Sequence, residues 1–160
     1  MFNIKSAASA ALFVSIVCGL LWILLKQQTL IQVSVNTQSC RLTQDHFELQ
    51  WRHSVEKTQW TEFYHIQDQH LILAYTDLVS FGAGTPSHYP IIFQKNGLVR
   101  MKVNQQLPEL SWFISERMQG AIVTVGHHWK LYQDFPNYSL VHIQVVQQPL
   151  WKIWQIGACP

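Results

Sequence analysis

The sequence is short of charge, and it contains no cluster of basic residues. Charged residues make up 12% of its 160 residues, with 11 Lys and Arg against 9 Asp and Glu. Lys5 and Lys26 flank an apolar run, and without these two the remaining basic and acidic residues are equal in number. Because nucleic-acid-binding proteins need a concentrated positive surface, this balance argues against a nucleic-acid partner.

The motifs of common metal, nucleotide and hydrolase sites are also missing. The chain has eight His but no His-x-His, Cys-x-x-Cys or His-Glu-x-x-His spacing, and these are spacings that metal ligands typically have. It has neither a Gly-x-Gly-x-x-Gly loop nor a Gly-x-Ser-x-Gly nucleophile elbow. We therefore expect no metal, no cofactor and no catalytic residue, and we do not expect an enzyme.

One long apolar run is present, and it lies near the amino terminus. It extends without charge from Ala7 to Leu25, close to the roughly 20 residues that a bilayer-spanning helix needs. No small-x-small cleavage site follows it. We expect residues 1–28 to form an uncleaved membrane anchor and residues 29–160 to form one extracytoplasmic β-domain. The predicted location is the inner membrane, single-pass, with the domain in the periplasm.

Three cysteines bear on the compartment. Cys18 lies inside the apolar run, whereas Cys40 and Cys159 lie near the two ends of the expected domain. In an oxidising periplasm these two could form a disulfide. Two unpaired thiols are the favoured alternative, because the sequence gives no distance between them.

Most of the remaining chain alternates apolar and polar residues, the period of two that is typical of half-buried strands. Asn96-Gly97 favours a type I′ hairpin turn, 110–115 and 121–125 are expected to form a further hairpin, and 151–156 alternates but need not pair. The pattern predicts an all-β fold, an antiparallel β-sandwich or small barrel, preceded by a single transmembrane helix. The expected strands are 30–35, 47–54, 60–67, 71–76, 91–94, 98–103, 110–115, 121–125, 127–132 and 139–146.

Polar, ionisable and aromatic residues are densest between Trp51 and Tyr64, where two strands and a turn are expected. From His53 the sequence reads His-Ser-Val-Glu-Lys-Thr-x-Trp-x-Glu-x-Tyr, and from Ser80 it reads Ser-Phe-Gly-Ala-Gly-x-Pro. These two motifs, followed by Leu-Pro-Glu-Leu from Leu107, resemble the bacterial family catalogued as domain of unknown function 1850. The resemblance covers about 42–145. Gln59 departs from it, because the family usually has proline there.

The resemblance implies a role beside a transporter. The family's members look like small exported proteins encoded next to TAXI-type TRAP transporters, which are tripartite. We therefore expect a membrane-anchored periplasmic accessory protein that docks to the permease subunit or to the extracytoplasmic substrate-binding protein. The alternative is a module that binds a small carboxylate through Lys57 and the glycine-containing loop. The third hypothesis, a hydrolase, has the least support.

The chemistry of the motif residues admits several interpretations. Ser54 and Lys57 have the Ser-x-x-Lys spacing of penicillin-binding enzymes, but the companion motifs are missing. Glu56 and Glu62 could act as a carboxylate pair or form ion pairs at a sheet edge. If the two motifs meet in space, they form one polar pocket or one docking edge. The candidate docking or ligand site is His53, Ser54, Glu56, Lys57, Trp60, Glu62, Tyr64, Ser80, Phe81, Gly82, Gly84 and Pro86.

Overall fold

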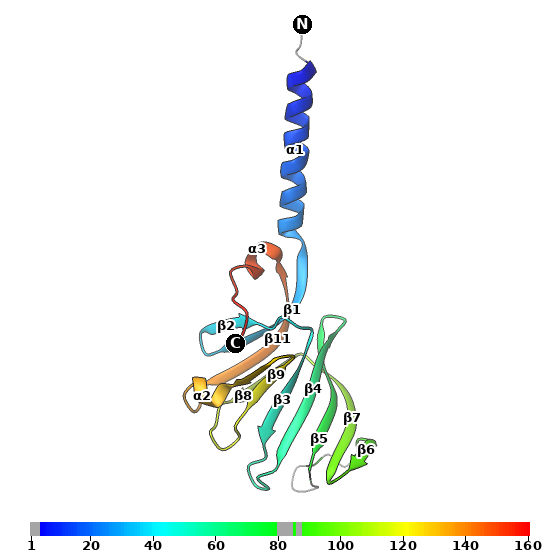
Figure 1. Cartoon of the computed structure of the whole chain (residues 1–160), viewed down its shortest axis with the longest axis vertical. Coiled ribbons are helices and arrows are strands. Elements are labelled where there is room, and N and C mark those ends of the chain that lie inside the picture. Colours follow the sequence, from blue (N-terminus) through cyan, green and yellow to red (C-terminus); the bar gives the residue numbers. More distant parts are fainter. Residues whose placement is uncertain (1–3, 80–84, 86–87) are drawn as a thin grey trace.

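The computed structural model describes residues 4–79, 85 and 88–160, and Figure 1 shows a helix followed by two layers of strands. The helix, α1 (Ile4–Leu25), is followed after one residue by the first strand. The smaller sheet has the strand order β2-β1-β11-β8. Its strands are β1 (Gln27–Val35), β2 (Gln38–Arg41), β8 (Glu109–Phe113) and β11 (Leu140–Pro149).

The larger sheet has the order β10-β9-β3-β4-β5-β7-β6. All strand pairings in both sheets are antiparallel. Since the strands form two separate sheets, the structure is a sandwich and not a barrel. The strands of the large sheet are β3 (His46–Arg52), β4 (Gln59–Gln67), β5 (His70–Leu78), β6 (Ile91–Lys95), β7 (Leu98–Leu107), β9 (Ala121–Thr124) and β10 (His127–Lys130).

The main core lies between the two sheets. Ile31 and Val33 of β1 pack in one buried cluster with Phe47 and Leu49 of β3. Fully burying an apolar side chain of this size stabilises a fold by about 1.5–3 kcal/mol. Because strand residues alternate between faces, the neighbours of Phe47 and Leu49 on β3 point to the opposite side. We call that side, away from the small sheet, the outer face of the large sheet.

The predicted hairpin around the first motif is confirmed. β3 and β4 pair from His46↔His65 to Arg52↔Gln59, and the tip is 53–58. The Asn96-Gly97 turn is confirmed as well. Both residues have positive φ, 53° and 81°, as a type I′ turn requires, and the turn joins β6 to β7.

The predicted hairpin of 110–115 with 121–125 is wrong. β8 belongs to the small sheet and pairs with β11, whereas β9 belongs to the large sheet and pairs with β3 and β10. The chain therefore crosses from one layer to the other between β8 and β9. Burial alternates along β8 but not along β9, and an apolar face indicates which side of a strand is buried, not which strand it pairs with.

The carboxyl-terminal segment 151–156 packs against the domain without pairing, one of the two possibilities that the sequence left open. The segment from Leu150 to Ile153 forms a short helix, α3, in which Ile153 is buried. A second short helix, α2 (Leu131–Asp134), follows β10 and buries Leu131. In each case one apolar residue contacts the domain, and a single turn of helix achieves this without strand pairing.

Among the residues whose positions the structure describes, no helix is both long enough and apolar enough to cross a membrane. The transmembrane helix expected from the sequence is therefore not confirmed.

Cys40 and Cys159 form a disulfide, which resolves the alternative that the sequence left open. The bond connects β2 to the carboxyl-terminal tail across 119 residues. Beside it, the backbone N–H of Cys159 donates to the carbonyl oxygen of Arg41 at 2.9 Å, and that of Arg41 donates to Gly157 at 2.9 Å. The tail is thereby held along the exposed edge of the small sheet.

Removing this disulfide should destabilise the domain strongly. In the chain-entropy model, a cross-link over a loop of this length stabilises by about 4–5 kcal/mol. We expect the double variant Cys40→Ser, Cys159→Ser to lose free energy of unfolding on that scale in urea titrations. Cys18→Ser, which changes the free cysteine in α1, is the control and should unfold like the wild type. A double variant as stable as that control would contradict the prediction.

Candidate functional site

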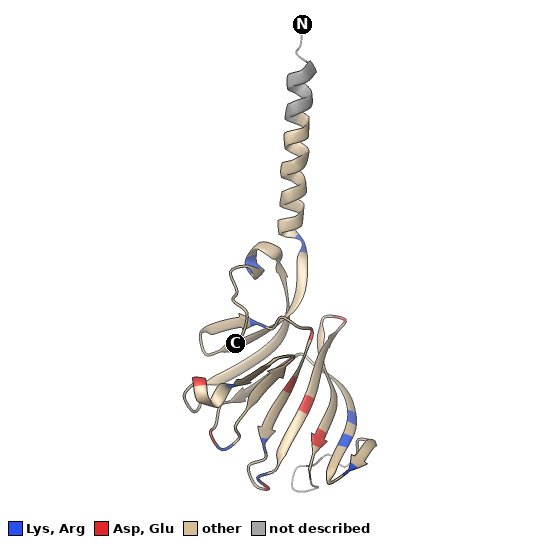
Figure 2. Cartoon of the chain, in the orientation of Figure 1, with Lys and Arg blue, Asp and Glu red and all other residues tan. Residues whose placement is uncertain are grey.

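Charged residues gather on the large sheet and its loops, as Figure 2 shows. On β3, the strand alternation directs Glu48, Gln50 and Arg52 to the outer face. On β10 it directs His128 and Lys130 there, because Trp129 between them is buried in the core. The two groups are close in space because β9 pairs with both strands: Ala121 is opposite Gln50 on one side and opposite Lys130 on the other.

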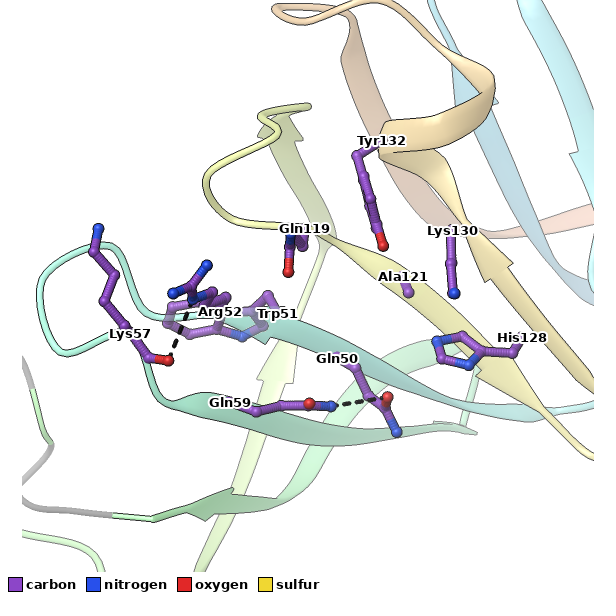
Figure 3. A pocket seen from close by; sticks show the side chains of 10 residues that line it. All are labelled: Gln50, Trp51, Arg52, Lys57, Gln59, Gln119, Ala121, His128, Lys130 and Tyr132. Carbon is purple, nitrogen blue, oxygen red and sulfur yellow. Dashed lines mark hydrogen bonds between the residues drawn. The ribbon is translucent and has the colours of Figure 1, made fainter.

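A cavity of about 360 Å³ opens at this position on the outer face. Ala121 forms its floor, and a larger side chain there would fill it. Figure 3 shows the Tyr132 hydroxyl and the Lys130 ammonium group extending over this floor, with the His128 ring nearby and the Gln50 side chain directed toward Gln59. We call it the basic cavity, and its lining residues are Gln50, Trp51, Arg52, Lys57, Gln59, Gln119, Ala121, His128, Lys130 and Tyr132.

The lining residues carry positive charge and no negative charge. It includes Arg52, Lys57 and Lys130 but no Asp or Glu. Among the residues that the structure describes, none of these three cations forms an ion pair with a carboxylate. Like charges around one cavity repel one another and raise the local concentration of anions.

Neutral hydrogen-bonding groups complete the lining. The Gln59 side chain donates from Nε2 to Gln50 Oε1 at 3.0 Å, which fixes the orientation of both amides. Arg52 donates from Nε to the carbonyl oxygen of Lys57 at 3.3 Å, so one edge of its guanidinium group is anchored and its other N–H groups stay available. The cavity therefore presents donors from Arg52, Lys130, Tyr132 and the glutamine amides, which suits an oxygen-bearing anion.

The hairpin tip places four of the residues predicted from the first motif. The ring of His53 accepts a hydrogen bond at Nδ1 from the backbone N–H of Glu56 at 3.2 Å and stacks on Trp60 with centroids 5.3 Å apart. Lys57 Nζ donates to the carbonyl oxygen of Ser54, and Figure 3 shows its ammonium group pointing away from the basic cavity. Lys57 thus contributes to the rim. The Ser-x-x-Lys pair does not have the arrangement of a nucleophile and its base.

The predicted residues Trp60, Glu62 and Tyr64 lie on the inner face of β4, opposite to the basic cavity. The Tyr64 hydroxyl donates to Glu62 Oε2 at 2.7 Å. Burial raises the pKa of the Glu62 carboxyl, although hydrogen bonds from Tyr64 and Trp51 oppose this effect. Burial and the adjacent Glu62 carboxylate also raise the pKa of Tyr64. The pair is an internal polar contact, and the structure does not bring it together with Lys57.

The second motif cannot be placed. Ser80, Phe81, Gly82, Gly84 and Pro86 lie outside the described residues, so the expectation that the two motifs meet stays a prediction. Within the described ranges, no group of three or more His, Cys, Asp or Glu side chains could hold a metal ion.

Most residues of the basic cavity were not among the predicted site residues. Lys57 was predicted, but Arg52, His128 and Lys130 were not. A signal for them existed in the alternation, which puts Gln50 with Arg52, and His128 with Lys130, on solvent-facing sides of two strands. What the sequence did not reveal is that β9 lies between these strands and pairs with both.

The fold and this cavity define the chain as an all-β sandwich with a positively lined cavity on one sheet. The family described as "Domain of unknown function (DUF1850)" matches residues 47–131, more than half of the chain, and the protein belongs to this family. The matched segment begins in β3 and ends just after β10, so it includes every residue lining the basic cavity except Tyr132. No curated protein matches the chain, and no solved structure matches it.

The raised pKa of Glu62 predicts a pH-dependent stability. The folded state holds the Glu62 proton more tightly than the unfolded state, so its contribution to stability is complete below the ordinary carboxyl pKa. That contribution is lost as pH rises through the raised folded value. Glu62→Gln keeps an acceptor for Tyr64 and cannot ionise. We therefore expect the urea midpoint of Glu62→Gln, relative to that of the wild type, to increase as pH rises from 4 to 7.5.

The control for this experiment is Glu116→Gln, which changes an exposed loop residue. Its midpoint should follow that of the wild type across the pH range. If the Glu62→Gln and wild-type midpoints also stay parallel, Glu62 ionises alike in the folded and unfolded states, and the prediction is wrong.

Proposed function

We propose that this domain binds a small organic anion, a carboxylate, in the basic cavity. The observation that carries the proposal is that the cationic side chains Arg52 and Lys130 line one cavity, with Lys57 at its rim, and that its wall contains no carboxylate. Isolated cations are common on protein surfaces. Cations that share a cavity wall with amide side chains and a tyrosine hydroxyl favour an anionic ligand over a neutral one. This supports the carboxylate-binding alternative over catalysis.

The donor types favour a carboxylate over a spherical anion. Arg52 presents a planar fork of N–H groups that matches the two oxygens of a carboxylate, and Lys130 adds a compact charge. The amide of Gln119 offers a directional donor on the same wall. Lys57, which the sequence suggested as the main ligand, would contribute through its charge at the rim.

Butanoate should bind the full chain, whereas butanamide, its neutral counterpart of almost the same shape, should bind far more weakly. Hydrogen bonds to charged groups contribute about 1.5–3 kcal/mol, so Arg52→Gln or Lys130→Gln should weaken butanoate binding about tenfold or more. Isothermal titration calorimetry measures both effects. Lys95→Gln removes the same charge from the exposed end of β6 and is the control.

Two results would overturn the anion-binding proposal. One is equal affinity for butanoate and butanamide, which would mean that charge is not recognised. The other is an equal loss of affinity in Lys95→Gln and Lys130→Gln, which would mean that only the net charge of the domain matters. The loss of butanoate affinity in Lys57→Gln should lie between the losses in Lys95→Gln and Lys130→Gln.

A second candidate function is the transporter accessory role, with the domain held at the inner membrane by the amino-terminal segment. The observation that favours docking is the edge strand β6, in which Ile91, Ile92 and Phe93 are 47%, 50% and 45% exposed. An apolar edge strand is a ready template for pairing with another chain. The exposed apolar side chains of α1, including Phe13 and Trp22, support an anchor, and the disulfide supports an oxidising compartment such as the periplasm.

The docking proposal predicts specific co-purification. Tagged full-length chain in mild detergent should retain the permease subunit or the extracytoplasmic binding protein of a tripartite transporter. Ile92→Lys should lose that partner, because a charge on β6 blocks edge pairing. Tyr138→Lys, at another highly exposed position, should keep it. Retention of the partner by Ile92→Lys would remove β6 as the docking edge, and recovery of the chain alone would remove the accessory role.

A further inference from the structure

A second cavity adjoins the basic cavity on the outer face of the large sheet. It has a volume of about 380 Å³, and its wall is formed largely by Phe63, Ala74, Tyr75, Val123 and Val125. We call it the apolar cavity. The outer face thus has one cavity lined by cationic side chains and one lined mainly by apolar side chains.

The strand register places the two cavities side by side. Gln50 and Ala121, which line the basic cavity, are paired across β3 and β9. The pair two residues along the same strands, Glu48 and Val123, lines the apolar cavity. Because a strand rises about 3.3 Å per residue, the two rows are only about 7 Å apart, within the length of a short carbon chain.

The cation of the apolar cavity is already neutralised. Arg100 forms two hydrogen bonds to the Asp77 carboxylate: Nε donates to Oδ1 at 2.6 Å, and Nη2 donates to Oδ2 at 2.7 Å. Its guanidinium carbon lies 4.6 Å from the centre of the Phe63 ring. The Arg100 guanidinium group therefore lies over the Phe63 ring, and because its charge is paired with Asp77 it attracts an anion only weakly.

The remaining polar groups of the apolar cavity favour one orientation of a ligand that spans both cavities. Glu48 is partly buried at the boundary, where Gln50 Nε2 donates to its Oε2 at 3.4 Å, and its carboxylate repels an anionic group on the apolar side. His46 and His65 are paired across β3 and β4 at the far end, and His46 already contacts Asp45 at 2.8 Å. An elongated anion is thus favoured in only one orientation.

We propose that the ligand is a monocarboxylate with an apolar chain or ring, bound with its carboxylate in the basic cavity and its apolar part in the apolar cavity. This inference rests on the proposed anion-binding function and adds the class of ligand. A short anion without an apolar part would fill only half of the surface. A dicarboxylate would place its second charge beside Glu48.

The test is a series of straight-chain carboxylates titrated into the full chain by calorimetry: acetate, butanoate and hexanoate. Burying a methylene group raises affinity up to about fourfold, so we expect a gain of about twofold to fourfold for each added carbon. Glutarate, with a second carboxylate on a five-carbon chain, should bind more weakly than butanoate. Hexanamide should bind more weakly than hexanoate.

Paired variants assign the gain to the apolar cavity. Val123→Asn should flatten the dependence on chain length and leave acetate binding close to that of the wild type. Val55→Asn makes the same replacement at an exposed position on the hairpin tip and should keep the wild-type dependence. Lys130→Gln should weaken every member of the series by a similar factor.

The outcomes separate this inference from the function on which it rests. If acetate and hexanoate bind with equal affinity, and both depend on Lys130, anion binding holds and the amphipathic ligand is excluded. If no carboxylate binds better than its amide, the anion-binding function itself fails. A chain-length dependence that Val55→Asn removes as well as Val123→Asn would place the apolar contact elsewhere and overturn the inference.

Discussion

The pairing of β9 with β3 is the constraint on which the functional surface depends. It consists of three residue pairs, from Glu48↔Val123 to Gln50↔Ala121, and it forms only because the chain leaves the small sheet after β8. Without it, β10, which pairs with β9, would not lie one strand away from β3, and Lys130 would be separated from Arg52. One crossing between layers therefore creates both cavities, because the floor of one and part of the wall of the other come from β9.

The two arginines of the outer face show how context decides what a cation does. Arg100 is held against Asp77, a carboxylate that is only 7% exposed. Breaking such a pair would leave a buried charge unpaired, which is costly, so Arg100 remains where it is. Arg52 bonds only to a backbone carbonyl, and its charge stays uncompensated within the described structure. The first arginine contributes to the wall of a cavity, whereas the second keeps side-chain N–H groups that donate no hydrogen bond within the described residues.

Local patterns predicted what depends on neighbours in sequence. The β3–β4 hairpin follows from alternation on both sides of a short tip, and the turn at Asn96 follows from two residues that accept positive φ. The pairing of β8 was predicted wrongly because many strands offer an apolar face and only tertiary packing selects among them. The basic cavity was missed for the same reason: Lys130 lies far from Arg52 in sequence, and no local pattern connects them. The sequence could not predict the disulfide, because its formation depends on the carboxyl-terminal tail returning to the edge of β2.

The amino-terminal helix and the carboxyl-terminal tail both connect to the small sheet, whereas both cavities lie on the large one. α1 runs into β1 of the small sheet, and the carboxyl-terminal tail is bonded to β2 of the same sheet by the disulfide. Both cavities lie on the large sheet, on the face that points away from the small one. The small sheet, into which α1 runs, packs against the inner face of β3 through the buried core, and close-packed cores resist deformation.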